Sequence, residues 1–253
     1  MASCSCCFGY GGGVIRREHV ASWDDAHHGF WDTAIRGSSS LRAAMARALC
    51  DEAAVALGTN AGGVYFDLEK FYDNISVARL IVAADKHGYP SMAIALGLQV
   101  HLAPRIIRLM GHYGQWVSPS CSIVPGCMQS NKFAKLLLMN TLAKANASAH
   151  LATVEQYVDD LSMRSEGVRE QLVKRLIASA SDLNDDLTEA RLPVSELKTV
   201  ITASTAQIAT QVKAGMEVRG WSFKRARTVK DLGFQVGSGK RRVGGLVIKR
   251  GLK

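Results

Sequence analysis

The sequence predicts an α+β fold, in which the strands of a small sheet alternate along the chain with amphipathic helices. Short apolar runs of strand length occur at residues 62–68, on both sides of residues 159–160, at 198–204 and at 229–236. Between these runs, apolar residues recur at helical spacing. A hydrophobic fraction of 47% in 253 residues is sufficient for a sizeable core.

The composition also excludes some classes of protein. No run of about 18 apolar residues is present, and the first twenty residues lack the apolar stretch of a signal peptide. We therefore expect an intracellular protein with no membrane partner. Its net charge of +9 comes from residues 224–253, which hold ten Lys and Arg against one acid. Such a basic tail suits a phosphate backbone, and a solvated tail is the alternative.

Residues 1–26 are expected to be a disordered leader, because their Gly, Ser and Cys content shows no periodicity. Three cysteines, Cys4, Cys6 and Cys7, crowd into it. A zinc site that includes His27 and His28 is the alternative to a free leader.

The first predicted helix, over residues 38–57, begins with serines that are available as N-caps. Its apolar face consists of Leu41, Met45, Leu49 and Ala53. The next predicted helix, over 74–90, is capped near Asn74 or Ser76 and closed by Gly88 and Pro90. The elements expected after it are a helix over 91–101, strands broken by turns over 105–126, a helix over 129–145 and a helix over 167–187.

Two adjacent carboxylates, Asp159 and Asp160, lie inside the apolar stretch "YVDDLSM". Neighbouring residues of a regular strand face opposite sides, so the pair can act together only where the backbone turns. Two like charges at a turn are costly unless a cation neutralises them. A plain surface turn is the alternative for such a pair.

A second carboxylate site has the same form, because Asp67 ends the apolar run "GGVYFDL". Oxygen ligands without His or Cys favour Mg²⁺ or Mn²⁺ over Zn²⁺. Two-metal phosphoryl transfer needs about three carboxylates around ions roughly 3.5–4 Å apart. Asp67, Asp159 and Asp160 would supply them.

Five ordered segments make the resemblance specific. "FDLEKFYDNI", "GCMQSNKFA", "YVDD", "LPVSELKTVITAS" and "KDLGFQV" resemble, in this order, the palm motifs of reverse transcriptases. Upstream, "HHGFWDTAIRGSSSLRAA" is similar to the segment before the first carboxylate motif in non-LTR retrotransposon and group II intron enzymes.

The resemblance implies a metal site that holds two Mg²⁺ ions, with Mn²⁺ as the alternative ion. Asp67 and Asp159 would be the main ligands, Asp160 a supporting ligand, and the carbonyl of Leu68 would assist. The three aspartates and Lys198 would form the catalytic set, with Lys198 near the pyrophosphate leaving group.

The resemblance also implies a nucleotide site. Tyr72 occupies the position of an aromatic steric gate against ribose, with core packing as the alternative. Gln129 would lie under the incoming nucleotide, although Ser130 stands where the family usually has Gly. Arg36 would contact the triphosphate or the template backbone.

The implied architecture is a polymerase palm, a ferredoxin- or RRM-like antiparallel sheet with helices on one face. We expect partial helical fingers over 27–60, the palm over 61–236 with finger elements around 90–120, and a basic tail over 237–253 as the start of an absent thumb.

The expected function is that of a retroelement reverse transcriptase, which adds deoxynucleotides to a primer on an RNA or DNA template. The alternative is a catalytically inactive or domesticated palm that binds nucleic acid. An RNA-templated RNA polymerase conflicts with Tyr72 and with "YVDD".

Overall fold

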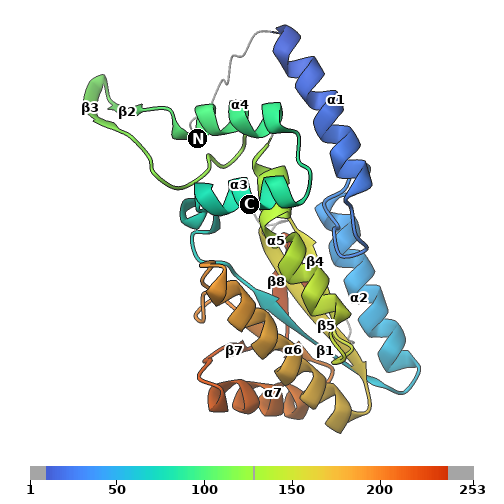
Figure 1. Cartoon of the computed structure of the whole chain (residues 1–253). Helices are drawn as coiled ribbons and strands as arrows, with labels where there is room; N and C mark the ends of the chain where they lie inside the picture. Colours follow the sequence, from blue (N-terminus) through green and yellow to red (C-terminus); the bar gives the residue numbers. More distant parts are fainter. Residues whose placement is uncertain (1–9, 128, 239–253) are drawn as a thin grey trace, which may run out of the picture. The chain divides into compact units, whose positions relative to one another are not determined.

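The structure is a computed structural model, and it describes residues 10–127 and 129–238 (Figure 1). The chain divides into two compact units that are not consecutive in sequence. The helical unit comprises Met1–His28 and Lys70–Met139, and the sheet unit comprises Gly29–Glu69 and Asn140–Lys253. The domain boundaries expected from the sequence stay predictions.

A five-stranded sheet forms the centre of the sheet unit. The order of its strands is β4 (Thr153–Tyr157), β5 (Asp160–Gly167), β1 (Asn60–Phe66), β6 (Val200–Ala203) and β7 (Lys224–Arg225). Neighbours are antiparallel except β6 and β7, which are parallel. A separate hairpin is formed by β8 (Val229–Asp231) and β9 (Phe234–Val236).

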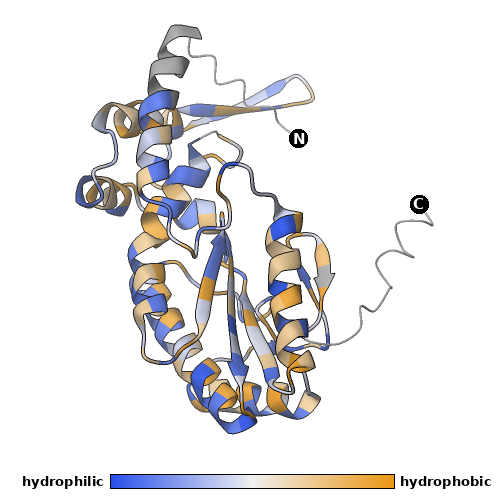
Figure 2. Cartoon of the chain, turned by 90° about the vertical axis from the view of Figure 1, so that its right-hand side faces the viewer, coloured by the Kyte–Doolittle hydropathy of each residue, from blue (hydrophilic) through white to orange (hydrophobic). Residues whose placement is uncertain are grey.

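Helices cover both faces of this sheet, as Figure 2 shows. On one face, α6 (Arg169–Glu189) packs so closely that a Cβ built at Gly62 of β1 would lie 3.0 Å from Leu176. On the other face, α2 (Ser40–Ala56) brings the Asp51 charge near Tyr65. The predicted α+β class is confirmed, but the expectation of helices on one face alone is wrong. Apolar residues on both faces of β1 are buried, Val64 and Phe66 on one face and Ala61 on the other, so both faces need cover.

Helix α2 begins after the N-cap Ser39, as the serines predicted, but it buries an unexpected face. Leu41, Met45 and Leu49, which the periodicity placed on an apolar face, are 44%, 40% and 52% exposed. The buried residues are Ala43, Ala44, Arg47, Asp51 and Ala54. Small alanines let the helix approach the sheet closely, and the two charged residues find partners there.

The remaining predicted elements of the sheet unit occur in the expected order, and the unit also contains one helix and one strand, β7, that the sequence did not predict. The leucines of α6 that share one helical face are buried: Leu172, Leu176, Leu183 and Leu187. A further helix, α7 (Ala206–Val218), begins at Thr205, whose side chain accepts a hydrogen bond from the Ile208 N–H. Gly215 of α7 permits close contact with α6, because a Cβ there would lie 2.1 Å from Ile177. Of the basic tail predicted over 237–253, residues 239–253 lie outside the described residues.

The helical unit contains α1 (Tyr10–Ala26), the short 3-10 helix η1 (Phe71–Asn74), α3 (Val77–Lys86), α4 (Ser91–Leu102), a hairpin of β2 (Arg105–Leu109) and β3 (His112–Val117), and the part of α5 (Ser130–Ala147) up to Met139. Helices α3, α4 and α5 confirm the predicted segments. No helix of the described part of the chain combines the length and apolar character that a membrane span needs.

The predicted disordered leader is wrong for residues 10–26, which form α1. Residues 1–9, with the three crowded cysteines, lie outside the described residues. The end of α1 is anchored by Asp24, whose carboxylate lies 2.7 Å from the buried Lys135 ammonium and also contacts Lys132. The Trp23 indole N–H donates to the His87 carbonyl at 2.8 Å. These two contacts fix the C-terminal end of α1 to α5 and to the segment after α3.

His101, at the end of α4, is fully buried. Its Nδ1 accepts a hydrogen bond from the Val124 N–H at 2.9 Å, so the neutral ring holds its proton on Nε2. Burial, and then the nearby Arg105 charge, lowers the pKa of His101 to about 4. The unfolded chain binds a proton at His101 below about pH 6.5, whereas the folded chain does not. Stability contributed by neutral His101 is therefore present above pH 6.5 and is lost as the pH falls toward 4.

We predict that His101→Asn removes this pH dependence, because the Asn Oδ1 can accept from the Val124 N–H and does not titrate. Between pH 7 and pH 4, wild type should lose up to about 3 kcal/mol relative to the variant. Urea unfolding at several pH values measures this difference. Parallel pH profiles of the two proteins would contradict the assignment.

Candidate active site

The turn between β4 and β5 carries the adjacent aspartates. Tyr157 pairs with Asp160, so Val158 and Asp159 form a two-residue turn. The sequence predicted a turn here, but one residue later, at Asp159 and Asp160. Val158 has φ 62°, a left-handed conformation that is strained for a β-branched residue. The Gln156 side-chain amide donates to the Val158 carbonyl at 2.6 Å and holds the turn. The turn places Asp159 outside the strand ladder and Asp160 at its first position.

The third carboxylate, Asp67, follows the end of β1 at the same edge. Phe66 lies opposite Leu161, so the next positions outward are Asp67 on one strand and Asp160 on the other. The Asp67 N–H donates to Thr199 Oγ1 at 3.3 Å, and its carbonyl accepts from the Ser195 N–H at 2.8 Å. The backbone of Asp67 is thus fixed by the segment before β6.

The three carboxylates influence one another electrostatically. Burial, and then the Asp67 charge, raises the pKa of Asp159. Asp160 reaches solvent at the start of β5, but surrounding protein atoms remove part of its hydration. This desolvation, and then the charges of Asp159, Asp231 and Asp67, raise the pKa of Asp160 to about 6. The edge therefore holds an excess of negative charge that a bound cation would relieve.

The positive charge of Lys198 neutralises part of this negative charge. Its ammonium Nζ lies 3.3 Å from Asp67 Oδ1, and both side chains reach solvent. The contact joins two residues that the sequence assigned to one catalytic set. It also means that a metal ion would compete with Lys198 for the Asp67 carboxylate.

The donor chemistry at this edge suits a divalent cation, because carboxylate oxygens are the ligands that Mg²⁺ and Mn²⁺ prefer. Within residues 10–127 and 129–238, no three His, Cys, Asp or Glu side chains lie close enough together to hold a metal ion. Gathering Asp67, Asp159 and Asp160 around one ion would require side-chain rotation from the arrangement seen here.

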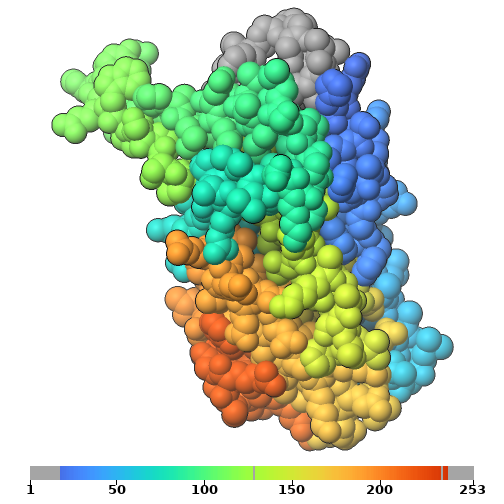
Figure 3. Space-filling model, in the orientation of Figure 1, coloured from blue at the N-terminus to red at the C-terminus, as the bar shows by residue number. Residues whose placement is uncertain are grey.

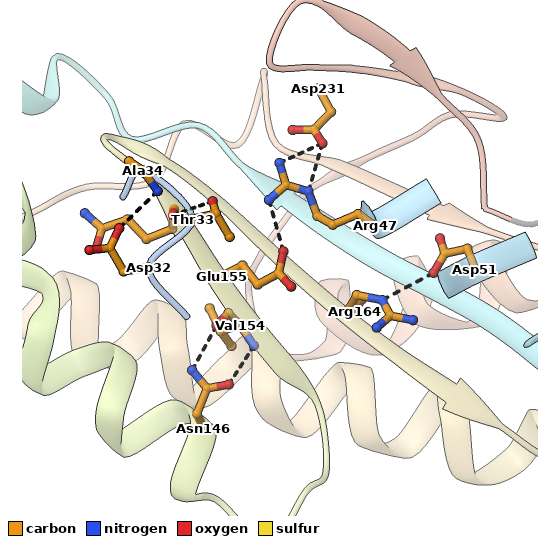
Figure 4. A network of polar contacts seen from close by, with 11 residues as sticks. Asp32, Thr33, Ala34, Arg47, Asp51, Asn146, Val154, Glu155, Arg164 and Asp231 are labelled. Carbon is orange, nitrogen blue, oxygen red and sulfur yellow. Dashed lines mark hydrogen bonds and ion pairs between the residues drawn. The ribbon is translucent and has the colours of Figure 1, made fainter. Parts of the chain in front are cut away.

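Beneath this edge, Arg47 of α2 joins three elements of the sheet unit (Figure 4). Its Nε and Nη2 both lie 3.0 Å from Asp231 Oδ2 of β8, and its Nη1 lies 3.2 Å from Glu155 Oε2 of β4. Arg47 and Asp231 are almost fully buried. Burial raises the pKa of Asp231 and the Arg47 charge opposes that rise. These ion pairs fix the β8–β9 hairpin against β4, the strand that leads into the turn with Asp159.

A second ion pair lies further along the same helix. Asp51 Oδ1 is 3.5 Å from Arg164 Nε of β5, and Asp51 is buried. Desolvation raises the pKa of Asp51, and the Arg164 charge opposes it. Sequence reasoning missed these charged residues, because it assigned α2 an apolar face. The only available signal was the spacing of Arg47 and Asp51, four residues apart between small alanines.

The segment that precedes α2 extends the sheet beyond β4. The Gln156 N–H donates to the Trp31 carbonyl at 2.7 Å, and the Thr33 N–H donates to the Gln156 carbonyl at 2.9 Å. Arg36 follows this segment and is exposed. Leu68 is buried and forms a bridge with Val194. The nucleotide roles of Arg36 and Leu68 stay predictions.

Two predicted nucleotide-binding residues belong to the helical unit. Tyr72 lies in η1, is partly exposed, and packs edge-on against Phe71. Gln129 is buried against α4, where a Cβ at Gly97 would lie 2.2 Å from its Oε1. Its side-chain amide has no hydrogen-bond partner among the described residues. The Ser130 hydroxyl donates to the Val124 carbonyl at 2.6 Å, so this departure from the family pattern has a local structural role.

Comparison with known proteins gives one family and one fold. The model of the family "Reverse transcriptase (RNA-dependent DNA polymerase)" matches residues 25–236. No curated protein matches the chain.

The fold is similar to that of fungal telomerases. Apo telomerase from Candida tropicalis, truncated from its C-terminal domain, gives a TM-score of 0.58 at 12% identity, covering 89% of this chain and 43% of that one. Telomerase from Candida albicans, in complex with a TWJ fragment of telomeric RNA, gives a TM-score of 0.56 at 13% identity, covering 92% of this chain and 39% of that one. The chain thus spans less than half of these structures, and the likeness concerns the fold alone.

We predict that Arg47→Met destabilises the protein by about 3–5 kcal/mol, because it leaves Asp231 buried without its partner. Adding Asp231→Leu should recover most of that loss, since removing both charges of a buried pair is close to neutral. Urea unfolding of the single and double variants measures the effect. Arg42→Met, at an exposed position of α2, is the matched control. Additive losses in the double variant would show that the two charges are not coupled.

Proposed function

The chain belongs to the reverse transcriptase (RNA-dependent DNA polymerase) family, and from this premise we propose that it adds deoxynucleotides to the 3′-hydroxyl of a primer paired with an RNA template. We further propose that it derives from a retroelement. The observation that carries the proposed activity is that the backbone places Asp67, Asp159 and Asp160 at one edge of the sheet, where the pKa of both aspartates of the turn is raised.

In this proposal the three carboxylates hold two Mg²⁺ ions, with Asp67 and Asp159 as the main ligands, Asp160 in support, and the Leu68 carbonyl assisting. Bound ions would neutralise the phosphates and lower the pKa of the attacking hydroxyl. The strained Val158 turn and the backbone hydrogen bonds of Asp67 fix the directions in which these carboxylates leave the strands. Fixed positions reduce the reorganisation that the transition state requires.

Lys198 would act on the leaving group. The primer oxygen forms a bond to the α-phosphorus of the deoxynucleotide as the bond to pyrophosphate breaks. Once cations occupy the carboxylates, the Lys198 ammonium is free of Asp67 and available to neutralise or protonate the pyrophosphate. The 3.3 Å contact between Lys198 and Asp67 supports a location beside the reacting groups.

The second candidate function is a palm that binds nucleic acid without catalysis. The observation that favours it is the same Lys198–Asp67 contact, which already supplies a cation to one of the three carboxylates. Binding of a primer–template without extension in either Mg²⁺ or Mn²⁺ would identify this function.

We predict that wild type extends oligo(dT) on poly(rA) with Mg²⁺ or Mn²⁺, and that Asp159→Asn reduces the rate at least about 100-fold, because a metal ligand is lost. Primer extension on denaturing gels measures this. Asp185→Asn, an exposed carboxylate on α6, is the matched control and should extend normally. Retained activity in Asp159→Asn would overturn the proposed site.

A second prediction concerns the choice of sugar. Tyr72 lies five residues after Asp67, and we propose that its ring clashes with a ribose 2′-hydroxyl. Tyr72→Ala should then raise ribonucleotide incorporation relative to deoxynucleotide incorporation by about tenfold or more, whereas Tyr72→Phe should keep discrimination. Steady-state kcat/KM values for the two nucleotides measure the ratio. An unchanged ratio in Tyr72→Ala would assign Tyr72 to packing alone.

A further inference from the structure

The β2–β3 hairpin of the helical unit exposes large side chains on both of its faces. It extends from the end of α4 as a separate arm of that unit (Figure 3). Trp116 and Leu109 are each 70% exposed, and Met110 at the turn is 91% exposed. A lone two-stranded hairpin is marginally stable in water, and a contiguous exposed apolar surface marks a place of interaction.

The strand register sorts these side chains into two faces. Ile106 lies opposite Trp116, and Arg108 lies opposite Tyr113. Ile106 and Arg108 are two residues apart on β2 and therefore share a face. The register shift between them brings Trp116 and Tyr113, which are three residues apart, onto that same face. We call it the aromatic face, with members Ile106, Arg108, Tyr113 and Trp116.

The opposite face has a different character. It carries the aliphatic side chains of Ile107, Leu109 and Val117, together with Arg105 and His112, and has neither Trp nor Tyr. We call it the aliphatic face. Because the two faces share one ribbon, each can serve as a control for the other.

The aromatic face has the chemistry of a base-stacking surface. The Arg108 guanidinium lies 5.4 Å from the centroid of the Tyr113 ring, so charge and ring combine in one place. The rows of Trp116 and Tyr113 are two residues apart along the ribbon, which is about 7 Å. Flat aromatic rings and Arg guanidinium planes are the groups on which unpaired bases stack.

The charge of the surrounding sequence points to a polyanion as partner. No Asp or Glu occurs in residues 86–154, a stretch that contains the whole hairpin. The basic residues in that stretch are Lys86, Arg105, Arg108, Lys132, Lys135 and Lys144. Lys132 and Lys135 pair with Asp24, and Lys144 pairs with Asp186, so the charges that carry this argument are Arg105 and Arg108 of the hairpin itself. A phosphate backbone is attracted to these guanidinium groups, and no carboxylate within the stretch opposes the approach.

We propose that the aromatic face of the β2–β3 hairpin binds an unpaired RNA strand, with bases stacked on Tyr113 and Trp116 and with Arg108 beside them. The choice of RNA rests on the proposed function. The hairpin selects an unpaired strand because duplex bases are separated by only about 3.4 Å along each strand and stack on one another. An unpaired strand can open to the wider spacing of the two rings and can insert a base at each.

The test is binding of a fluorescein-labelled oligouridine of about 20 nucleotides to the full chain, measured by anisotropy in EDTA without nucleotides. Trp116→Ala and Tyr113→Ala should each weaken binding by about tenfold or more. Trp116→Phe should bind within a few-fold of wild type, since it keeps a ring. Binding to a blunt RNA duplex should not change in any of them.

Leu109→Ala is the matched control, because Leu109 is as exposed as Trp116 but lies on the aliphatic face. It removes apolar area from the same hairpin and should leave oligouridine binding unchanged. If the hairpin of a variant does not fold, its binding result cannot be assigned to the side chain. A crosslinking measurement on wild type avoids this problem, because it needs no substitution. Crosslinks from 5-iodouridine in the same oligonucleotide, located by mass spectrometry on wild type, should fall on Tyr113 and Trp116.

Three results would overturn the proposal. The first is crosslinks that fall only outside the hairpin, and the second is that Leu109→Ala and Trp116→Ala weaken oligouridine binding equally. The third is that wild type is a dimer in light scattering and that Trp116→Ala dissociates the dimer but leaves RNA binding intact. The last would make the hairpin a contact between copies of the chain. Because the binding assay contains neither metal nor nucleotide, it can succeed where primer extension fails, so the two proposals fail separately.

Discussion

The crowding of like charges at one edge of the sheet is the constraint around which the sheet unit is built. Asp67, Asp159, Asp160 and Asp231 lie within electrostatic reach of one another, and burial together with this proximity raises the pKa of Asp160 to about 6. Such an arrangement costs stability unless cations lie nearby. Lys198 pairs with Asp67 and Arg47 pairs with Asp231, and the Arg47 charge offsets only part of the rise in the pKa of Asp160. Within the described residues, the turn therefore keeps an excess of negative charge. This excess of negative charge is the basis of the proposed cation site.

The buried ion pairs of α2 follow from the same constraint. A helix packed on this face must meet carboxylates of β4 and β8, so an apolar surface there would leave them without partners. The small residues Ala43, Ala44 and Ala54 let α2 lie close to the sheet. Arg47 and Asp51, one helical turn apart, pair with charged residues of the sheet unit. The larger residues Leu41, Met45 and Leu49 consequently face solvent. The ion pairs of Arg47 thereby connect the β8–β9 hairpin to β4, the strand that enters the turn with Asp159.

The two units differ in the charge of the segments that carry the proposed roles. The sheet unit holds the proposed catalytic carboxylates. The helical unit holds Tyr72, Gln129 and the β2–β3 hairpin, and its residues 86–139 contain no acid. An acid-rich edge suits metal-assisted phosphoryl transfer, and an acid-free segment suits contact with a phosphate backbone. Neither character follows from overall net charge, because the excess of +9 comes from the tail.

The sequence by itself determined the α+β class, most of the helices, and the turn at Asp159, because apolar periodicity and local turn chemistry are properties of neighbouring residues. The reverse-transcriptase motifs predicted the family, which the family match confirms, and the roles that they assign to the three carboxylates stay predictions. Only the tertiary structure decided which face of α2 is buried and that Arg47 joins Asp231, 184 residues away. It also decided that β2 and β3 gather two aromatic rings on one face. The physical reason is that a charged or aromatic side chain has no periodic signature of its own: its burial depends on a partner that folding brings from a distant part of the chain.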